Sequence, residues 1–136
     1  MSSTTDEPSE RTLTAIGVGS ALMQIVAFTA VGVVTLESVP YGVAVGGLSG
    51  AGAFLFLPWF LSLSAATEGG EAGLGQAAKR IDRAAGPGLF GLGLELGAIA
   101  ALALGFVRGP DLLLGLPAAL AVAVGVYLAG SALLGR

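Results

Sequence analysis

The sequence predicts an all-α membrane protein: an antiparallel bundle of four transmembrane helices in two helical hairpins, with a short amphipathic helix between spans two and three. Only 11% of the 136 residues are charged and 54% are hydrophobic, and the mean hydropathy is +0.88. Soluble domains carry about 25% charged residues. A chain this apolar therefore needs lipid around much of its surface.

Four uncharged or nearly uncharged apolar runs are the predicted spans, at about 13–36, 39–66, 89–107 and 112–134. Each is long enough to cross a hydrocarbon core of about 30 Å as a helix. Barrel strands would need a polar residue at every second position, and none of the runs alternates in this way. Short connections join antiparallel neighbours, and Ser38 and Asp111 are predicted to cap the second and fourth spans.

The residues before the first span, 1–12, are rich in Ser, Thr, Asp and Glu. They are expected to form a disordered acidic tail, because they have almost nothing apolar to bury. The apolar run that follows exceeds the roughly 7–15 residues of a signal-peptide core, so we expect it to be retained as a span. Residues 13–136 are then one transmembrane domain.

The connection between spans two and three contains a helical pattern at about 74–85. Its apolar residues recur every three or four positions, while Lys79, Arg80 and Arg83 share the opposite face. The sequence Gly86-Pro87-Gly88 is expected to end this helix. A basic amphipathic helix lies in the membrane interface, so these three residues are predicted to contact anionic lipid. Docking of an acidic partner is the alternative.

Lysine and arginine are distributed unequally between the two sides that four spans define. One side carries Arg11, Lys79, Arg80, Arg83 and Arg136, and the other carries only Arg108. The positive-inside rule therefore predicts a multi-pass protein of the plasma membrane with both termini in the cytoplasm.

Composition argues against several classes of function. The chain contains neither cysteine nor histidine, which removes the commonest general base and the commonest ligands of transition metals. We expect no catalytic, cofactor or metal site and no enzymatic activity. With a net charge of −3, binding of nucleic acid has no electrostatic basis. The single lysine beside five arginines and the acidic tail resemble the composition of proteins from halophiles.

Within span three, small residues recur at i, i+4 spacing and form a ridge of Gly93, Gly97, Ala101 and Gly105. Such ridges let helix backbones approach closely in lipid. The ridge is predicted to pack against another helix of the same bundle, and a homodimer face is the alternative.

Glu95 is the only charged residue in the run from Leu89 to Val107. Acids inside a membrane span face a protein interior, a water-filled cavity or an ion. With span three beginning at Leu89, Glu95 lies in the cytoplasmic half of the bilayer. Its predicted polar neighbours are Tyr127, Gln24, Ser20 and Ser62.

Two roles for Glu95 remain open. As a hydrogen-bonded acid between helices it indicates a structural or accessory membrane subunit, with a second copy or another membrane protein as a partner. As a proton- or cation-binding carboxylate it indicates a small coupled transporter or channel.

Overall fold

The computed structural model describes residues 10–68 and 70–135. The predicted acidic tail lies outside the described residues except for its last three positions, which belong to the first helix. The elements are α1 (Glu10–Leu36), α2 (Val39–Glu68), α3 (Gly70–Arg108) and α4 (Leu112–Leu133). This part of the chain has no strand.

All four helices are long and apolar enough to cross a membrane, over Thr14–Leu36, Val39–Ser64, Ile81–Arg108 and Leu112–Leu133. The predicted class, an all-helical chain with four apolar spans, is thereby confirmed. Spans one, two and four agree with the sequence within a few residues. Span three begins eight residues earlier than expected.

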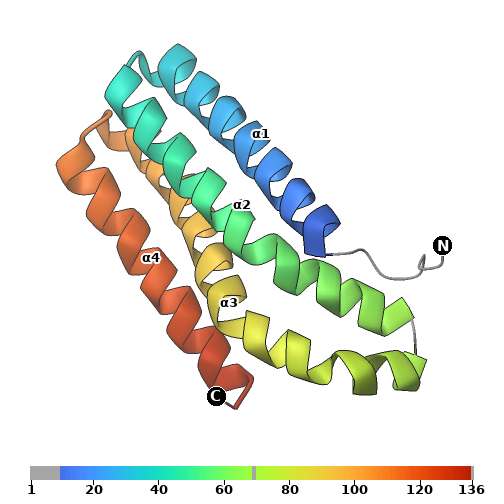
Figure 1. Cartoon of the computed structure of the whole chain (residues 1–136). Helices are drawn as coiled ribbons and strands as arrows, with labels where there is room; N and C mark the ends of the chain where they lie inside the picture. Colours follow the sequence, from blue (N-terminus) through green and yellow to red (C-terminus); the bar gives the residue numbers. More distant parts are fainter. Residues whose placement is uncertain (1–9, 69, 136) are drawn as a thin grey trace.

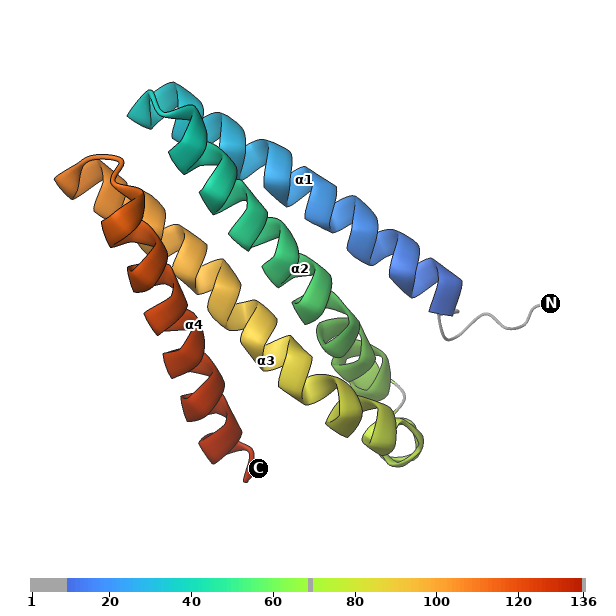
Figure 2. The ribbon, with the colours of Figure 1, turned by 60° about the vertical axis from the view of Figure 1, so that its left-hand side comes forward.

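The helices lie side by side in a row, in the order α1, α2, α3, α4 (Figures 1 and 2). Each packs mainly on its neighbours in the sequence, and within the described ranges α1 and α4 share no contact. Because α2 packs on α3 as closely as on α1, the division into two hairpins is not confirmed. The row leaves α1 and α4 as outer helices, covered on one side only.

The separate amphipathic helix predicted at about 74–85 is not found as a separate element, because α3 continues through Pro87. Figure 1 shows α3 bending in its yellow part instead of breaking. Proline removes one intrahelical hydrogen bond and pushes against the preceding turn, which kinks a helix without ending it when neighbours hold both halves. Here α2 runs beside both halves of α3 (Figure 1), which explains the continuity.

The two predicted helix caps are confirmed. The backbone N–H of Tyr41 donates to Ser38 Oγ at 3.2 Å, and that of Leu113 donates to Asp111 Oδ1 at 3.0 Å. Between α1 and α2 the chain turns through Glu37, whose φ of 55° lies in the left-handed region. These tight turns close the end of the row opposite the α2–α3 connection (Figure 1).

The packed core lies between α2, α3 and α4, near the end closed by the tight turns. It consists of Tyr41, Val45, Ala98, Ala101 and Ala119. Tyr41 is only 1% exposed and its hydroxyl donates to the Ala101 carbonyl oxygen at 2.5 Å. Tyr41 therefore lies between the helices and links α2 to α3.

Candidate functional site

Three polar side chains, one from each of α1, α2 and α3, meet about halfway along these helices. Ser49 Oγ on α2 lies 2.7 Å from Gln24 Oε1 on α1 and 2.5 Å from Glu95 Oε1 on α3. Ser49 is fully buried. We call these three residues the polar junction.

Close packing of α2 on α3 brings Ser49 to Glu95. A Cβ atom on Gly52 would lie 2.7 Å from the Gly91 carbonyl oxygen and 2.9 Å from the Glu95 backbone nitrogen. Likewise, a Cβ on Gly91 would lie 2.6 Å from the Gly52 carbonyl oxygen. The two backbones therefore touch one turn away from the carboxylate. Any side chain larger than the hydrogen atom of glycine would clash at this crossing.

A second close approach, between α1 and α2, brings in Gln24. A Cβ on Gly50 would meet the side chain of Ile25 and lie 3.0 Å from the Ala21 carbonyl oxygen. Gly50 follows Ser49 directly, and Ile25 follows Gln24. The glycines thus narrow both helix contacts at the level where the three polar side chains meet.

The junction lies near the middle of the predicted membrane thickness. Glu95 is midway between Ile81 and Arg108, the ends of the third apolar segment, and Gln24 is near the middle of Thr14–Leu36. The expectation that Glu95 lies in the cytoplasmic half took the span to begin at Leu89, after the Pro87 bend, and it stays a prediction. Counted from Ile81, the acid lies at the centre of the third apolar segment.

Hydrogen counting constrains the chemistry of the junction. A serine hydroxyl carries one hydrogen and can also accept, so Ser49 donates to only one of its two oxygen neighbours. The other contact is completed in one of two ways: the Gln24 amide turns its Nε2 toward Ser49, or a protonated Glu95 carboxyl donates to Ser49. The junction can therefore hold Glu95 with or without a proton.

The other polar neighbours predicted for Glu95 lie elsewhere. Tyr127 is 37% exposed and its ring contacts Phe90 edge to face at 6.3 Å; within the described part of the chain it makes no hydrogen bond to Glu95. Ser62 is 8% exposed but follows Ser49 by thirteen residues, about 20 Å along a helix. Ser20 lies one turn before Gln24 and is half-buried.

Sequence reasoning missed Ser49. The signal is present in the Gly46–Gly52 segment, where this serine is the only polar residue among glycines, leucine and alanine. A polar side chain on the glycine face of a span is placed where helices approach most closely. Its meeting with Glu95 still depends on how α2 and α3 align.

The predicted ridge on α3 packs inside the row. A Cβ on Gly93 would lie 2.6 Å from the Ala123 carbonyl oxygen, and one on Gly97 would meet the Ala119 backbone of α4. Ala101 is 1% exposed. Gly105 lies against Leu36 and the ring of Tyr41. The ridge therefore serves contacts between helices of one chain.

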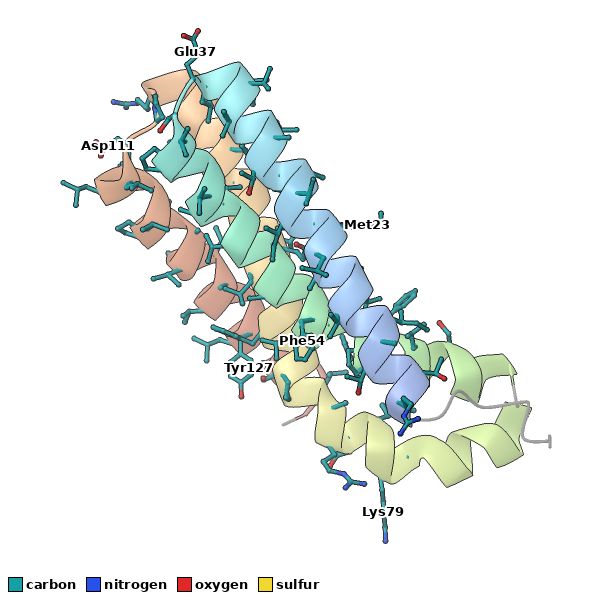
Figure 3. The ribbon with its side chains drawn as sticks, turned by 45° about the horizontal axis from the view of Figure 1, so that its top comes forward. Met23, Glu37, Phe54, Lys79, Asp111 and Tyr127 are labelled. Carbon is teal, nitrogen blue, oxygen red and sulfur yellow. The ribbon has the colours of Figure 1, made fainter. Side chains whose placement is uncertain are left out.

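The predicted lipid-contacting residues lie at the far end from the tight turns. Lys79 and Arg83 are exposed, and Lys79 points away from the helices (Figure 3). The side chain of Arg80 lies outside the described residues. Glu37 and Asp111 mark the opposite end (Figure 3). Exposed charges thus lie at both ends of the row: Lys79, Asp82 and Arg83 at one, and Glu37, Arg108 and Asp111 at the other.

Among the described residues, no group of three or more His, Cys, Asp or Glu residues is placed to hold a metal ion. Comparison with protein-family models, curated proteins and solved structures finds no match for the chain. The fold and its junction define a class: a small membrane protein of four apolar helices with one buried polar contact among three of them.

Proposed function

We propose that this protein is a structural or accessory subunit of the plasma membrane without catalytic activity. The observation that carries the proposal is that one buried hydroxyl, Ser49, contacts polar side chains from both neighbouring helices. In lipid, helix association receives little help from the hydrophobic effect, so packing and interhelical hydrogen bonds must supply it. The polar junction then fixes α1, α2 and α3 in register.

The energetics agree with this structural role. Interhelical hydrogen bonds in membranes contribute about 0.6 kcal/mol on average and up to about 1.7 kcal/mol. An acid at a helix centre costs roughly 2.5–3.5 kcal/mol by insertion scales. Placing Glu95 between helices, beside Ser49, offsets part of this cost. An accessory subunit also needs a surface for its partner, and α1 offers a broad apolar face that α2 leaves uncovered.

A second candidate function is proton- or cation-coupled transport through Glu95. The observation in its favour is the absence of a nearby counter-charge on α3. Arg83 and Arg108 are the basic residues that flank Glu95 on this helix, and each is about 18–20 Å away along its axis. An acid that stays in the membrane without a cation, beside groups that can exchange a proton, has the chemistry of a proton site.

The first prediction separates these functions by comparing Glu95→Gln with Glu95→Ala in reconstituted vesicles. Under the structural role we expect no pH-driven proton flux from any form. Glu95→Gln should keep most of the stability, because an amide still bonds Ser49, and Glu95→Ala should lower the free energy of unfolding by about 1–2 kcal/mol. A pH-sensitive dye inside the vesicles and denaturation in mixed micelles supply the two measurements.

Glu37→Gln is the matched control, because it removes an exposed acid from the turn between α1 and α2. It should leave both measurements unchanged. Flux in the wild type that disappears in Glu95→Gln, but persists in Glu37→Gln, would replace the structural role with transport.

The second prediction concerns orientation. We propose that the end of the row bearing Lys79, Arg80 and Arg83 faces the cytoplasm and contacts anionic lipid. A reporter active only in the cytoplasm should therefore be active when fused after Arg136, and an external protease should not cleave there. Activity of a reporter that requires export, fused at the same site, would reverse the proposed orientation.

A further inference from the structure

A cavity of about 370 Å³ lies where the bend of α3 separates its first half from α4. It is lined by Trp59 and Leu63 of α2, by Ala78, Ile81 and Asp82 of α3, and by Leu134 at the end of α4. Ile81 also begins the third apolar segment. The cavity therefore lies at the boundary between the apolar spans and the polar end of the row, separate from the polar junction.

The bend itself creates this space. Trp59 packs on the α3 backbone just after Pro87, where a Cβ on Gly88 would lie 2.6 Å from Trp59 Cβ. Before the proline, α3 changes direction (Figure 1), whereas α4 ends at Leu133. The last turn of α4 thus has no helix to pack on beyond the bend, and the gap stays open.

Trp59, which lines the cavity, carries a buried hydrogen-bond donor without a partner. In the described part of the chain, Trp59 Nε1 is buried and makes no hydrogen bond, and the same holds for Ser131 Oγ. Ser131 is not among the residues that line the cavity. Buried polar groups without partners are costly in an apolar medium. Trp59 lines the cavity, so a rotation of its indole ring toward the cavity would let Nε1 donate to an oxygen atom of a molecule bound there.

The lining identifies that molecule. Its walls are almost entirely apolar apart from Trp59 and the exposed Asp82 at its edge. Its volume falls within the range of about 300–1,000 Å³ typical of small-ligand pockets. A molecule with a hydrocarbon chain and an acceptor oxygen matches the walls and the indole N–H, and membrane phospholipid supplies both at this depth.

We infer that this cavity binds one hydrocarbon chain of a membrane phospholipid, whose ester or phosphate oxygen accepts a hydrogen bond from Trp59 Nε1. Lys79 and Arg83 neighbour Asp82 on α3 and are exposed, so an anionic headgroup is favoured over a zwitterionic one. That headgroup preference rests on the lipid contact proposed above for the basic residues. Binding of the hydrocarbon chain in the cavity does not depend on that contact.

The test uses Trp59 as its own reporter, because the protein contains one tryptophan. The full chain is reconstituted in phosphatidylcholine vesicles containing a small fraction of phosphatidylglycerol with brominated chains, which quench indole fluorescence on contact. Ala78→Leu fills the cavity from its exposed rim, and Ala121→Leu makes the same change on the exposed face of α4. We expect quenching to fall about twofold or more in Ala78→Leu, since the filled site has no room for a chain, and to stay at the wild-type level in Ala121→Leu.

Native mass spectrometry of the same proteins in detergent provides a second measurement. The wild type should retain one phospholipid, and Trp59→Phe should weaken retention about threefold to tenfold through the lost hydrogen bond. Lys79→Gln with Arg83→Gln should remove the preference for phosphatidylglycerol while phosphatidylcholine still binds. Equal quenching in the wild type and Ala78→Leu, or retention that Trp59→Phe leaves unchanged, would overturn the inference.

Discussion

Replacing Gly52 with valine is expected to lower the free energy of unfolding by about 3 kcal/mol. The first atom added to Gly52 would lie 2.7 Å from the Gly91 carbonyl oxygen and 2.9 Å from the Glu95 backbone nitrogen. Both are backbone atoms of α3, so no rotamer change relieves the clash. The two central helices must move apart along their whole contact.

Gly47→Val is the matched control for this prediction. Gly47 lies on the same helix, and a Cβ there would have open space around it. Any change in intrinsic helix preference is shared by both variants, and an exposed substitution of this kind should alter stability by no more than about 0.5 kcal/mol. Denaturation of both proteins in mixed micelles, followed by circular dichroism, measures the difference directly.

The clash should also separate Ser49 from Glu95, because the crossing lies within a turn of both. Adding Glu95→Ala to Gly52→Val should therefore cost less than Glu95→Ala costs in the wild type. Full additivity of the two changes would show that the α2–α3 crossing does not hold the polar junction together.

Hydropathy alone was sufficient to predict four spans, since each run excludes charge over a length that fits a bilayer. Helix starts were also predictable where a short polar side chain precedes an apolar run, as at Ser38 and Asp111. These features depend on residues close together in the sequence. They needed no knowledge of how the helices pack.

The start of span three was not predictable in the same way. Gly86-Pro87-Gly88 ends a helix in most local contexts, yet here α3 continues because α2 lies along both of its halves. Tertiary contacts override a local signal in such a case. The later start expected for span three set the expected depth of Glu95 and, with it, the expected set of neighbours.

The partners of Glu95 show the same limit. Gln24 was predicted as a neighbour, but the contact runs through Ser49, which no spacing rule selects. Its position depends on two glycine crossings, near Gly50 and Gly52, whose alignment is a property of the packed helices. A polar residue flanked by glycines in a span is the sequence pattern that could have pointed to it.

Replacing Tyr41 with alanine is expected to lower the free energy of unfolding by about 2–3 kcal/mol. Tyr41 belongs to the buried core with residues of α3 and α4, and Gly105 and Gly115 lie against its ring. Neither glycine has a side chain that can fill the space left by the ring. Because lipid replaces water outside the helices, lost packing accounts for most of the expected cost.

Tyr41→Phe separates the hydroxyl from the ring. It removes the hydrogen bond to the Ala101 carbonyl oxygen and should cost only about 0.6–1.7 kcal/mol. The carbonyl keeps its partner within α3, which limits the loss.

Tyr127→Ala is the control, because Tyr127 is the second of two tyrosines and is exposed on the outer helix α4. It should cost about 1 kcal/mol, through its contact with Phe90. Unfolding of all three variants in mixed micelles gives the ranking. If Tyr41→Ala and Tyr127→Ala lower the free energy of unfolding equally, the ring of Tyr41 does not hold α2 against α3 and α4. If Tyr41→Ala lowers the free energy of unfolding more than Tyr127→Ala does, while Tyr41→Phe lowers it only slightly, packing of the Tyr41 ring on Gly105 and Gly115 stabilises the contact of α2 with α3 and α4 at this end of the row.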